Sequence, residues 1–236
     1  MEYSSLANRR NVLIGAGAAV VVAAAGGAWY FLGRGDGGMS RVDGALPVPA
    51  GAEFNMTALM TPAGGVADHP VGAEDARVVM IEYLSPSCPH CATFANTVYP
   101  QLKAEYIDTG KIRFIPRPFM RNVLDAVVFM LAEAAGPEQY HEVIDTFFRT
   151  QNQWLASDKP NDAIFAIAQQ LGFTKESYDA ALTNQELFAG LEALRDQATQ
   201  EFRLQGTPTF YVNGKMLRGE TSLAALKAEI DPLLEA

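Results

Sequence analysis

VVMIEYLSPSCPHC, residues 78–91, combines a strand with a pair of cysteines at the start of a helix. The first four residues are all apolar, which is typical of a strand covered on both faces. Cys88 and Cys91 follow, and they are the only two cysteines in the chain. Apolar residues then recur at four-residue spacing and predict a helix from Pro89 to Gly110. The cysteine pair is therefore expected where a strand meets a helix N-terminus.

The C-x-x-C spacing allows the two thiols to close and reopen a small disulfide ring. The helix dipole and the imidazole of His90 both favour the thiolate of Cys88. A zinc clip normally needs four ligands, and besides the cysteines the chain offers only His69, His90 and His141. A structural disulfide between residues so close in sequence would close too short a loop to stabilise much. We therefore predict a redox enzyme without a metal or another cofactor.

The N-terminal segment predicts export. Residues 12–32 carry no charge and follow Arg9-Arg10. At about 1.5 Å per residue this run is long enough to cross a bilayer core of about 30 Å, and the preceding arginines place the N-terminus inside. Alanines at 23–25 offer a cleavage site, and the arginine pair resembles a twin-arginine signal. We predict a signal or a membrane anchor over residues 1–33, with the Sec and twin-arginine routes both open. The bulk of the protein is thus expected in the periplasm or another extracytoplasmic space.

The charge balance argues against one class of partner. The 236 residues contain 18 Lys and Arg against 27 Asp and Glu, a formal net charge of −9. The sequence has no basic tract of the kind that binds phosphate backbones. Nucleic acid is therefore not an expected partner.

Residues 34–70 have the composition of a linker. They are rich in Gly, Pro and Ala and show no sustained periodicity. Only Phe54 to Met60 suggests an ordered element, which we predict to be a short strand. The first part of the folded domain is expected to begin at residue 71.

The remaining chain follows the pattern of an α/β domain. Residues 71–120 hold the first strand, the cysteine-bearing helix and a second strand that Pro116 and Pro118 should end. Apolar stripes at helical spacing predict an insertion of four or five helices over residues 121–204. Residues 205–236 return to strands, with an Asn-Gly pair that predicts a hairpin, and finish in an amphipathic helix.

Together these motifs resemble the DsbA family of extracytoplasmic thiol:disulfide oxidoreductases. The likeness rests on the Cys-Pro-His-Cys sequence, on Glu82 six residues before Cys88, and on Thr207-Pro208 ahead of the hairpin. It covers residues 68–235. The fold that it implies is α/β, a thioredoxin-like fold with an inserted α-helical subdomain.

The resemblance also implies catalytic roles. Cys88 is expected to be the nucleophile that forms mixed disulfides, and Cys91 the resolving thiol. His90 is expected to raise the thiolate fraction of Cys88. Glu82 stands in an otherwise apolar strand, where an acid is costly unless it is used. It is expected to accept a proton from Cys91 through water, and the alternative is an edge position that faces solvent.

Three further residues are expected beside the bound substrate. Pro208 matches the cis-proline of the family, which faces the cysteine pair and presents its backbone to a peptide. Thr207 and Pro89 flank the same place and are expected to contact the substrate.

We therefore predict an enzyme that introduces disulfide bonds into exported proteins and passes the electrons to a membrane redox partner. A disulfide reductase or isomerase remains open. Isomerases of this superfamily usually add an N-terminal dimerisation domain, and residues 33–70 look too short for one. A different class is a binding module that holds Cu(I) between the thiolates of Cys88 and Cys91.

Overall fold

The structure is a computed structural model that describes residues 51–219 and 221–235. The predicted signal or anchor over residues 1–33 and the first half of the predicted linker lie outside the described residues. In the part that is described, no helix is both long enough and apolar enough to cross a membrane.

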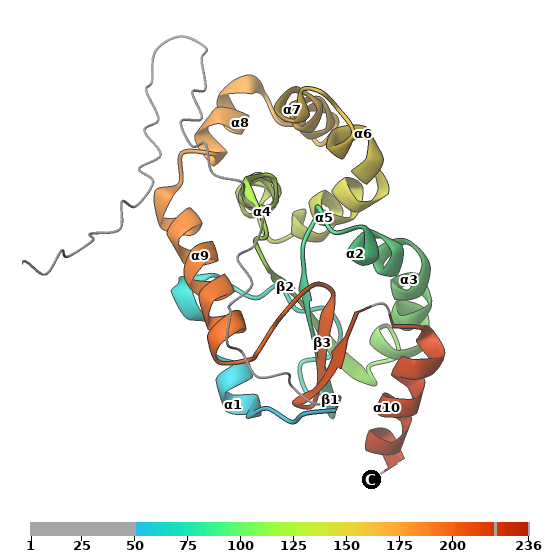
Figure 1. Cartoon of the computed structure of the whole chain (residues 1–236). Coiled ribbons are helices and arrows are strands. Elements are labelled where there is room, and N and C mark those ends of the chain that lie inside the picture. The colour runs from blue at the N-terminus through green and yellow to red at the C-terminus, as the bar shows by residue number, and fades with distance from the viewer. Residues whose placement is uncertain (1–50, 220, 236) are drawn as a thin grey trace, which may run out of the picture. The chain divides into compact units, whose positions relative to one another are not determined.

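A mixed sheet stands at the centre of the described residues (Figure 1). Its strands are β1 (Val78–Leu84), β2 (Ile112–Pro118), β3 (Thr209–Val212) and β4 (Lys215–Arg218). They lie in the order β2-β1-β3-β4, with β1 parallel to β2 and the other neighbours antiparallel. Asn213 and Gly214 connect β3 to β4 with φ angles of 44° and 93°, as a type I′ turn requires. The predicted hairpin is confirmed.

Helices cover both faces of the sheet, and each face has its own apolar core. One face packs against the interrupted helix that follows the cysteines and against the last helix. These elements are α2 (Pro89–Thr93), the π-turn η2 (Phe94–Val98), α3 (Tyr99–Leu102), the π-turn η3 (Lys103–Ile107) and α10 (Leu223–Glu235). The other face packs against α1 (Met56–Leu59) and the end of α9 (Gln185–Gln200). Cover on both faces explains why β1 is a continuous apolar run.

The remaining helices form a subdomain with a third apolar core, which includes both cysteines. They are α4 (Val123–Ala135), α5 (Tyr140–Arg149), α6 (Gln151–Leu155), α7 (Pro160–Gln170) and α8 (Lys175–Ala181). With α9, six helices separate β2 from β3 along this fully described stretch, against the four or five predicted. Only Thr150 separates α5 from α6, so their apolar stripes run together in the sequence. The inserted helical subdomain is confirmed, while its boundaries at residues 121 and 205 stay predictions.

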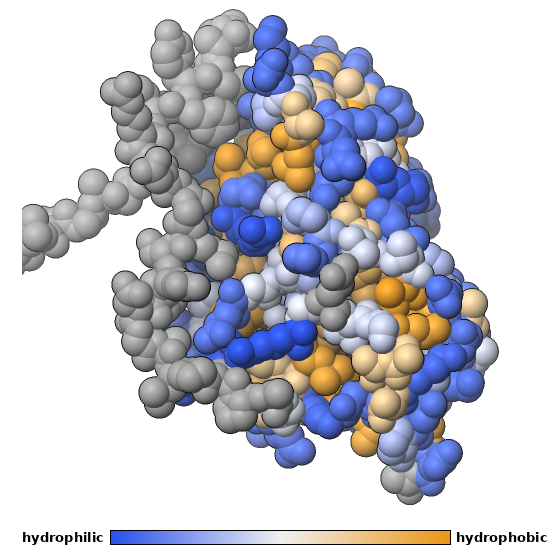
Figure 2. All heavy atoms as spheres, turned by 45° about the vertical axis from the view of Figure 1, so that its right-hand side comes forward, coloured by the Kyte–Doolittle hydropathy of each residue, from blue (hydrophilic) through white to orange (hydrophobic). Residues whose placement is uncertain are grey.

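The surface mixes polar and apolar groups. Figure 2 shows hydrophilic atoms over most of one face, with apolar atoms in separate groups. Among the described residues the exposed large apolar side chains are Met60 and Val123, 39% and 45% exposed. Val123 begins α4, directly after the residue that caps this helix.

The linker prediction is wrong for the described half of residues 34–70. Residues 56–59 form the helix α1 rather than a strand, and Leu59 is fully buried. The backbone of residue 53 bridges to Lys215 on β4, and the backbone of Val71, just past the segment, bridges to Phe114 on β2. This segment is therefore part of the packed domain.

Glycine, which suggested flexibility here, instead allows close packing. Gly64 has a φ angle of 76° and lies against Gly190 of α9. A Cβ atom on Gly64 would come within 2.3 Å of the Gly190 carbonyl oxygen. Both the positive φ and the close approach require glycine, which is why composition alone misled the prediction.

Arg117 ties this segment to β2. Its guanidinium is fully buried and donates to Asp68 through Nε at 2.8 Å and Nη2 at 2.5 Å. Its Nη1 donates to the Leu59 carbonyl oxygen at 2.5 Å and to the Tyr83 hydroxyl at 3.2 Å. One buried side chain thus joins two points of the N-terminal segment to the sheet.

The prediction that Pro116 and Pro118 end the second strand is also wrong, because β2 continues to Pro118. β2 is the outer strand of the sheet. The Phe114 N–H donates to the Val71 carbonyl oxygen at 2.8 Å, away from β1. Residues 116 and 118 share that outward side, since strand residues alternate. Proline there removes no hydrogen bond to β1.

Candidate active site

The cysteine pair lies where β1 meets α2, as the sequence predicts. Cys88 is the N-cap of α2 and is 3% exposed, while Cys91 lies one turn further on and is fully buried. Both are free thiols. The Thr207–Pro208 peptide bond is cis, and the Cys88 Sγ donates to the Thr207 carbonyl oxygen at 3.1 Å. The fold thus brings the two motifs together from opposite ends of the domain.

The surroundings of Cys88 favour its thiolate form. The pKa of Cys88 is lowered from 9.0 to about 5, and the largest cause is a hydrogen bond with the Cys91 thiol, which outweighs the opposing effect of burial. Hydrogen bonds with Thr207 and with the Cys91 backbone and the positive charge of Arg121 make smaller contributions to the same lowering. Most of Cys88 is therefore thiolate at neutral pH.

Cys91 and Glu82 have the opposite character. Burial raises the pKa of Cys91 well above its usual value, and the hydrogen bond to Cys88 and the charge of Glu82 raise it further. Glu82 lies on β1, an interior strand, and is 3% exposed. Burial, followed by the charge of Cys88, raises the pKa of the Glu82 carboxyl well above its usual range. The solvent-facing alternative for Glu82 is thus wrong, while its role as proton acceptor stays a prediction.

Pro89 and His90 form the exposed part of the site. Both lie on the first turn of α2, with Pro89 at its first position. The imidazole of His90 is exposed next to the nucleophile. The predicted contributions of His90 to the thiolate and of Pro89 to substrate binding stay predictions.

Sequence reasoning missed three residues around the nucleophile: Arg121, Asp125 and Gln151. Arg121 precedes the N-cap of α4, Asp125 is buried in the first turn of α4, and Gln151 is buried at the start of α6. A buried carboxylate three residues after the N-cap Asn122 is the one available signal, since an acid is costly in an otherwise apolar helix. No local pattern marks the other two.

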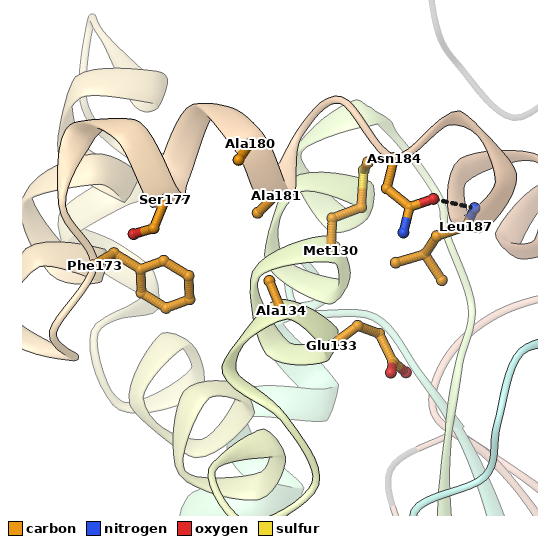
Figure 3. Close-up of a pocket in the computed structure, with 9 residues that line it drawn as sticks. All are labelled: Met130, Glu133, Ala134, Phe173, Ser177, Ala180, Ala181, Asn184 and Leu187. Carbon is orange, nitrogen blue, oxygen red and sulfur yellow. Dashed lines mark hydrogen bonds between the residues drawn. The ribbon is translucent and has the colours of Figure 1, made fainter.

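Neither metal-binding groups nor the pocket in the helical subdomain offers a comparable site. The described residues contain no group of three or more His, Cys, Asp or Glu side chains placed to hold a metal ion. A pocket of about 560 Å³ lies among α4, α8 and α9 (Figure 3). None of the predicted site residues lines it, and Asn184 there uses its side-chain oxygen to accept from the Leu187 N–H at 3.0 Å. The cysteine pair remains the candidate active site.

Comparison with known proteins agrees with this geometry. The family model described as "Thioredoxin" matches residues 65–232. The crystal structure of alpha-DsbA1 from Wolbachia pipientis superposes with a TM-score of 0.70 at 24% identity, over 77% of this chain and 96% of that one, and so shares its fold. The chain is a DsbA-like member of the thioredoxin family. The predicted family and fold class are confirmed.

Curated relatives of this DsbA-like protein carry names from disulfide chemistry. A Rickettsia bellii protein named "Putative protein-disulfide oxidoreductase" is 33% identical over 172 residues, which are 71% of this chain and 65% of that protein. A Bacillus anthracis protein named "Probable disulfide bond formation protein D" is 30% identical over 176 residues, 70% of this chain and 77% of that one. This chain thus covers slightly less than two thirds of the Rickettsia relative. Both names agree with the predicted enzyme class, a thiol:disulfide oxidoreductase, which for this chain is taken up as a proposal.

The pKa values of the two thiols make a direct prediction about alkylation. The rate at Cys88 should be near its plateau at pH 6.5 and should fall about tenfold per pH unit below a midpoint near pH 5, because only the thiolate reacts. Cys91, measured in a Cys88→Ser variant, should react at least about tenfold more slowly at pH 7, since it is buried and protonated. Mass spectrometry of timed iodoacetamide reactions measures both rates. Equal rates, or a Cys88 midpoint near the free-thiol value of about 8.5, would contradict the assignment.

Proposed function

We propose that this DsbA-like protein introduces disulfide bonds into exported proteins, with Cys88 and Cys91 as its redox pair. The observation that carries the proposal is the asymmetry of the two thiols. The pKa of Cys88 is lowered to about 5 while that of Cys91, one helical turn away, is raised. A nucleophile that ionises easily beside a thiol that does not is the arrangement that disulfide exchange needs.

The reaction begins with the pair oxidised. A thiolate of the substrate attacks the Cys88 sulfur, a mixed disulfide forms, and the sulfur of Cys91 leaves with the electron pair and takes up a proton. The second substrate thiolate then attacks the substrate sulfur of the mixed disulfide and releases Cys88 as a thiolate. The substrate loses two electrons and gains a disulfide, and the enzyme pair gains the two electrons. In this scheme Glu82, buried on β1, exchanges the proton of Cys91.

The direction follows from which state the site stabilises. A thiolate at Cys88 exists only when the pair is reduced, so every interaction that lowers the pKa of Cys88 favours reduction of the pair and makes the disulfide an oxidant. A low pKa also makes Cys88 the better leaving group from a mixed disulfide. Both effects favour the oxidase over the reductase.

The place of action is part of the proposal. The uncharged run at residues 12–32 after Arg9-Arg10 supports export, or anchoring with the domain outside the membrane. Exported chains with unpaired cysteines are then the substrates. A membrane redox partner accepts the electrons and restores the Cys88–Cys91 disulfide.

The proposal is tested by comparing the reduced and oxidised proteins. A lowered folded-state pKa contributes stability that is fully present above the unfolded pKa and is lost as pH falls through the folded value. For Cys88 this window runs from about pH 9 down to about pH 5. At about 1.4 kcal/mol per unit, and after allowance for screening, the thiolate should stabilise the reduced form by about 2 kcal/mol at pH 7. Urea denaturation should therefore show the reduced protein to be the more stable at pH 7, with the difference shrinking by about this amount at pH 4.

Glu82→Gln is the control for this experiment. Glu82 is a buried carboxyl of the site whose pKa is raised well above its usual range, chiefly by burial, and glutamine keeps its size without titrating. The pH dependence of the difference should survive this change. An oxidised protein that is the more stable at pH 7 would contradict the oxidase and support the reductase.

A further inference from the structure

The loop that carries the nucleophile is held by a carboxylate from the helical subdomain. Asp125 of α4 is fully buried. Its Oδ1 accepts from the Ser87 N–H at 2.7 Å, and its Oδ2 accepts from the Ser85 hydroxyl at 2.8 Å and from the Arg121 N–H at 2.8 Å. The Asn122 side chain adds a bond to the Ser87 hydroxyl at 2.8 Å. Residues 85 and 87 are thereby fixed from the side of α4.

Gln151 of α6 holds the same loop through its carbonyl groups. The side chain is 6% exposed, and its Nε2 donates to the Pro86 oxygen at 2.7 Å and to the Cys88 oxygen at 3.0 Å. The Cys88 oxygen also accepts the first hydrogen bond of α2, from the Ala92 N–H at 3.1 Å. One amide thus holds the backbone on both sides of Ser87 and at the very start of the helix.

These contacts reach the nucleophile only through the backbone. The lowered pKa of Cys88 depends on where its sulfur lies relative to Cys91 and Thr207. That position is set by the backbone of residues 86–88, which Asp125 and Gln151 hold. Without the amide of Gln151 the Pro86 oxygen loses the partner that the structure gives it, and a buried carbonyl without a partner is costly enough to shift the loop.

We propose that Gln151 and Asp125 are positioning residues for Cys88, through which the helical subdomain sets the reactivity of the redox pair. The inference rests on the proposed disulfide exchange at Cys88. By this inference the inserted helical subdomain affects the reactivity of Cys88, in addition to any role in substrate binding. These positioning roles also explain why two polar side chains are buried at the starts of α4 and α6.

The decisive variants replace the side-chain amide of Gln151, whose Nε2 donates both hydrogen bonds. Gln151→Met keeps the length and removes the N–H groups, whereas Gln151→Glu keeps the shape and directs a carboxylate at two carbonyl oxygens. Gln153→Met is the matched control, because it makes the same change on an exposed residue of the same helix. We expect the alkylation rate of Cys88 at pH 6 to fall about tenfold in Gln151→Met and further in Gln151→Glu. The control should stay within about twofold of the wild type.

The readouts separate positioning from stability. The thiolate absorbance of the reduced protein, followed against pH, should show the midpoint of Cys88 moving upward in both Gln151 variants. A merely structural role would lower the denaturation midpoint and leave the thiolate titration unchanged, and that result would overturn the inference. Asp125→Asn keeps the size and one acceptor oxygen, and should shift the titration in the same direction. The titration of Asp125→Asn tests the inference if a Gln151 variant does not fold.

The same assays distinguish this inference from the proposed function. Wild-type protein that fails to oxidise a reduced model peptide would overturn the proposed function, whatever the variants do. Wild-type protein that oxidises the peptide, together with Gln151→Met and Asp125→Asn proteins whose titrations and rates match it, would overturn the inference alone.

Discussion

Replacing Cys91 with alanine should leave a protein that captures its substrates in mixed disulfides but does not turn them over. The nucleophile remains, so Cys88 can still attack a substrate disulfide, expelling one substrate sulfur and keeping the other in a mixed disulfide. Cys91, which could attack Cys88 and release the substrate in reduced form, is gone, and no other cysteine exists in the chain. The expelled substrate sulfur can still re-attack the mixed disulfide, but that step only reverses the capture and oxidises nothing. Turnover should therefore fall to the uncatalysed level, while mixed disulfides with exported proteins accumulate. Non-reducing gels of cell extracts, repeated after reduction, measure both species.

Cys91→Ser sharpens this experiment. Serine also cannot form the internal disulfide, but its hydroxyl can still donate to the Cys88 sulfur, which is the interaction that lowers the pKa of Cys88 most. Both variants should lose turnover, whereas the thiolate midpoint of Cys88 should rise more in the alanine variant than in the serine variant. Cys88→Ala should form no mixed disulfides at all. Equal midpoints in the two Cys91 variants would show that Cys91 does not stabilise the thiolate.

The second large effect is expected at Arg117. Arg117→Met should lower the free energy of unfolding by about 3–5 kcal/mol, because it leaves the Asp68 carboxylate and the Leu59 carbonyl without their buried partner. The N-terminal segment should loosen first, since this side chain holds it at both points. Urea denaturation measures the loss, and limited proteolysis should show new cleavage between residues 59 and 71.

Arg113→Met is the matched control for Arg117. Arg113 lies on the same strand, is half-buried, and donates from Nη1 to the Glu74 carbonyl oxygen at 3.2 Å. The same substitution there should cost at most about 1 kcal/mol. A double variant, Arg117→Met with Asp68→Leu, should recover much of the loss, because apolar replacement of a whole buried pair is often tolerated. Similar losses for the two arginines would show that the ion pair contributes little.

The features that the sequence revealed correctly are local ones. The strand before Cys88, the helix after it and the Asn213-Gly214 turn each depend on residues within a few positions of one another. The cis bond before Pro208 followed from the resemblance, since spacing alone gives no reason to expect it. Such short-range patterns were enough for the fold class and for the two thiols.

The features that the sequence hid depend on contacts between distant residues. Gln151 and Cys88 are separated by 63 positions, and Asp68 and Arg117 by 49. Nothing in the neighbourhood of Gln151 distinguishes it from the exposed Gln153. The composition of the segment before residue 71 wrongly suggested a linker for the same reason. Gly64 is required by its close contact with Gly190 on α9, which lies more than a hundred residues later in the sequence.

The backbone contacts of residues 52 and 71 have a consequence for how the protein meets unfolded chains. An open sheet edge invites another polypeptide to add a strand. On β4 the Met216 N–H already donates to the Ala52 oxygen at 2.8 Å. On β2 the backbones of Val71 and Phe114 exchange two hydrogen bonds of 2.8 Å, and Pro116 and Pro118 have no N–H to donate. The N-terminal segment thus already uses part of each border of the sheet, which leaves less of either edge for strand addition. A substrate held by a bond to sulfur, which exchange breaks, would have to compete with this segment for backbone hydrogen bonds at these edges.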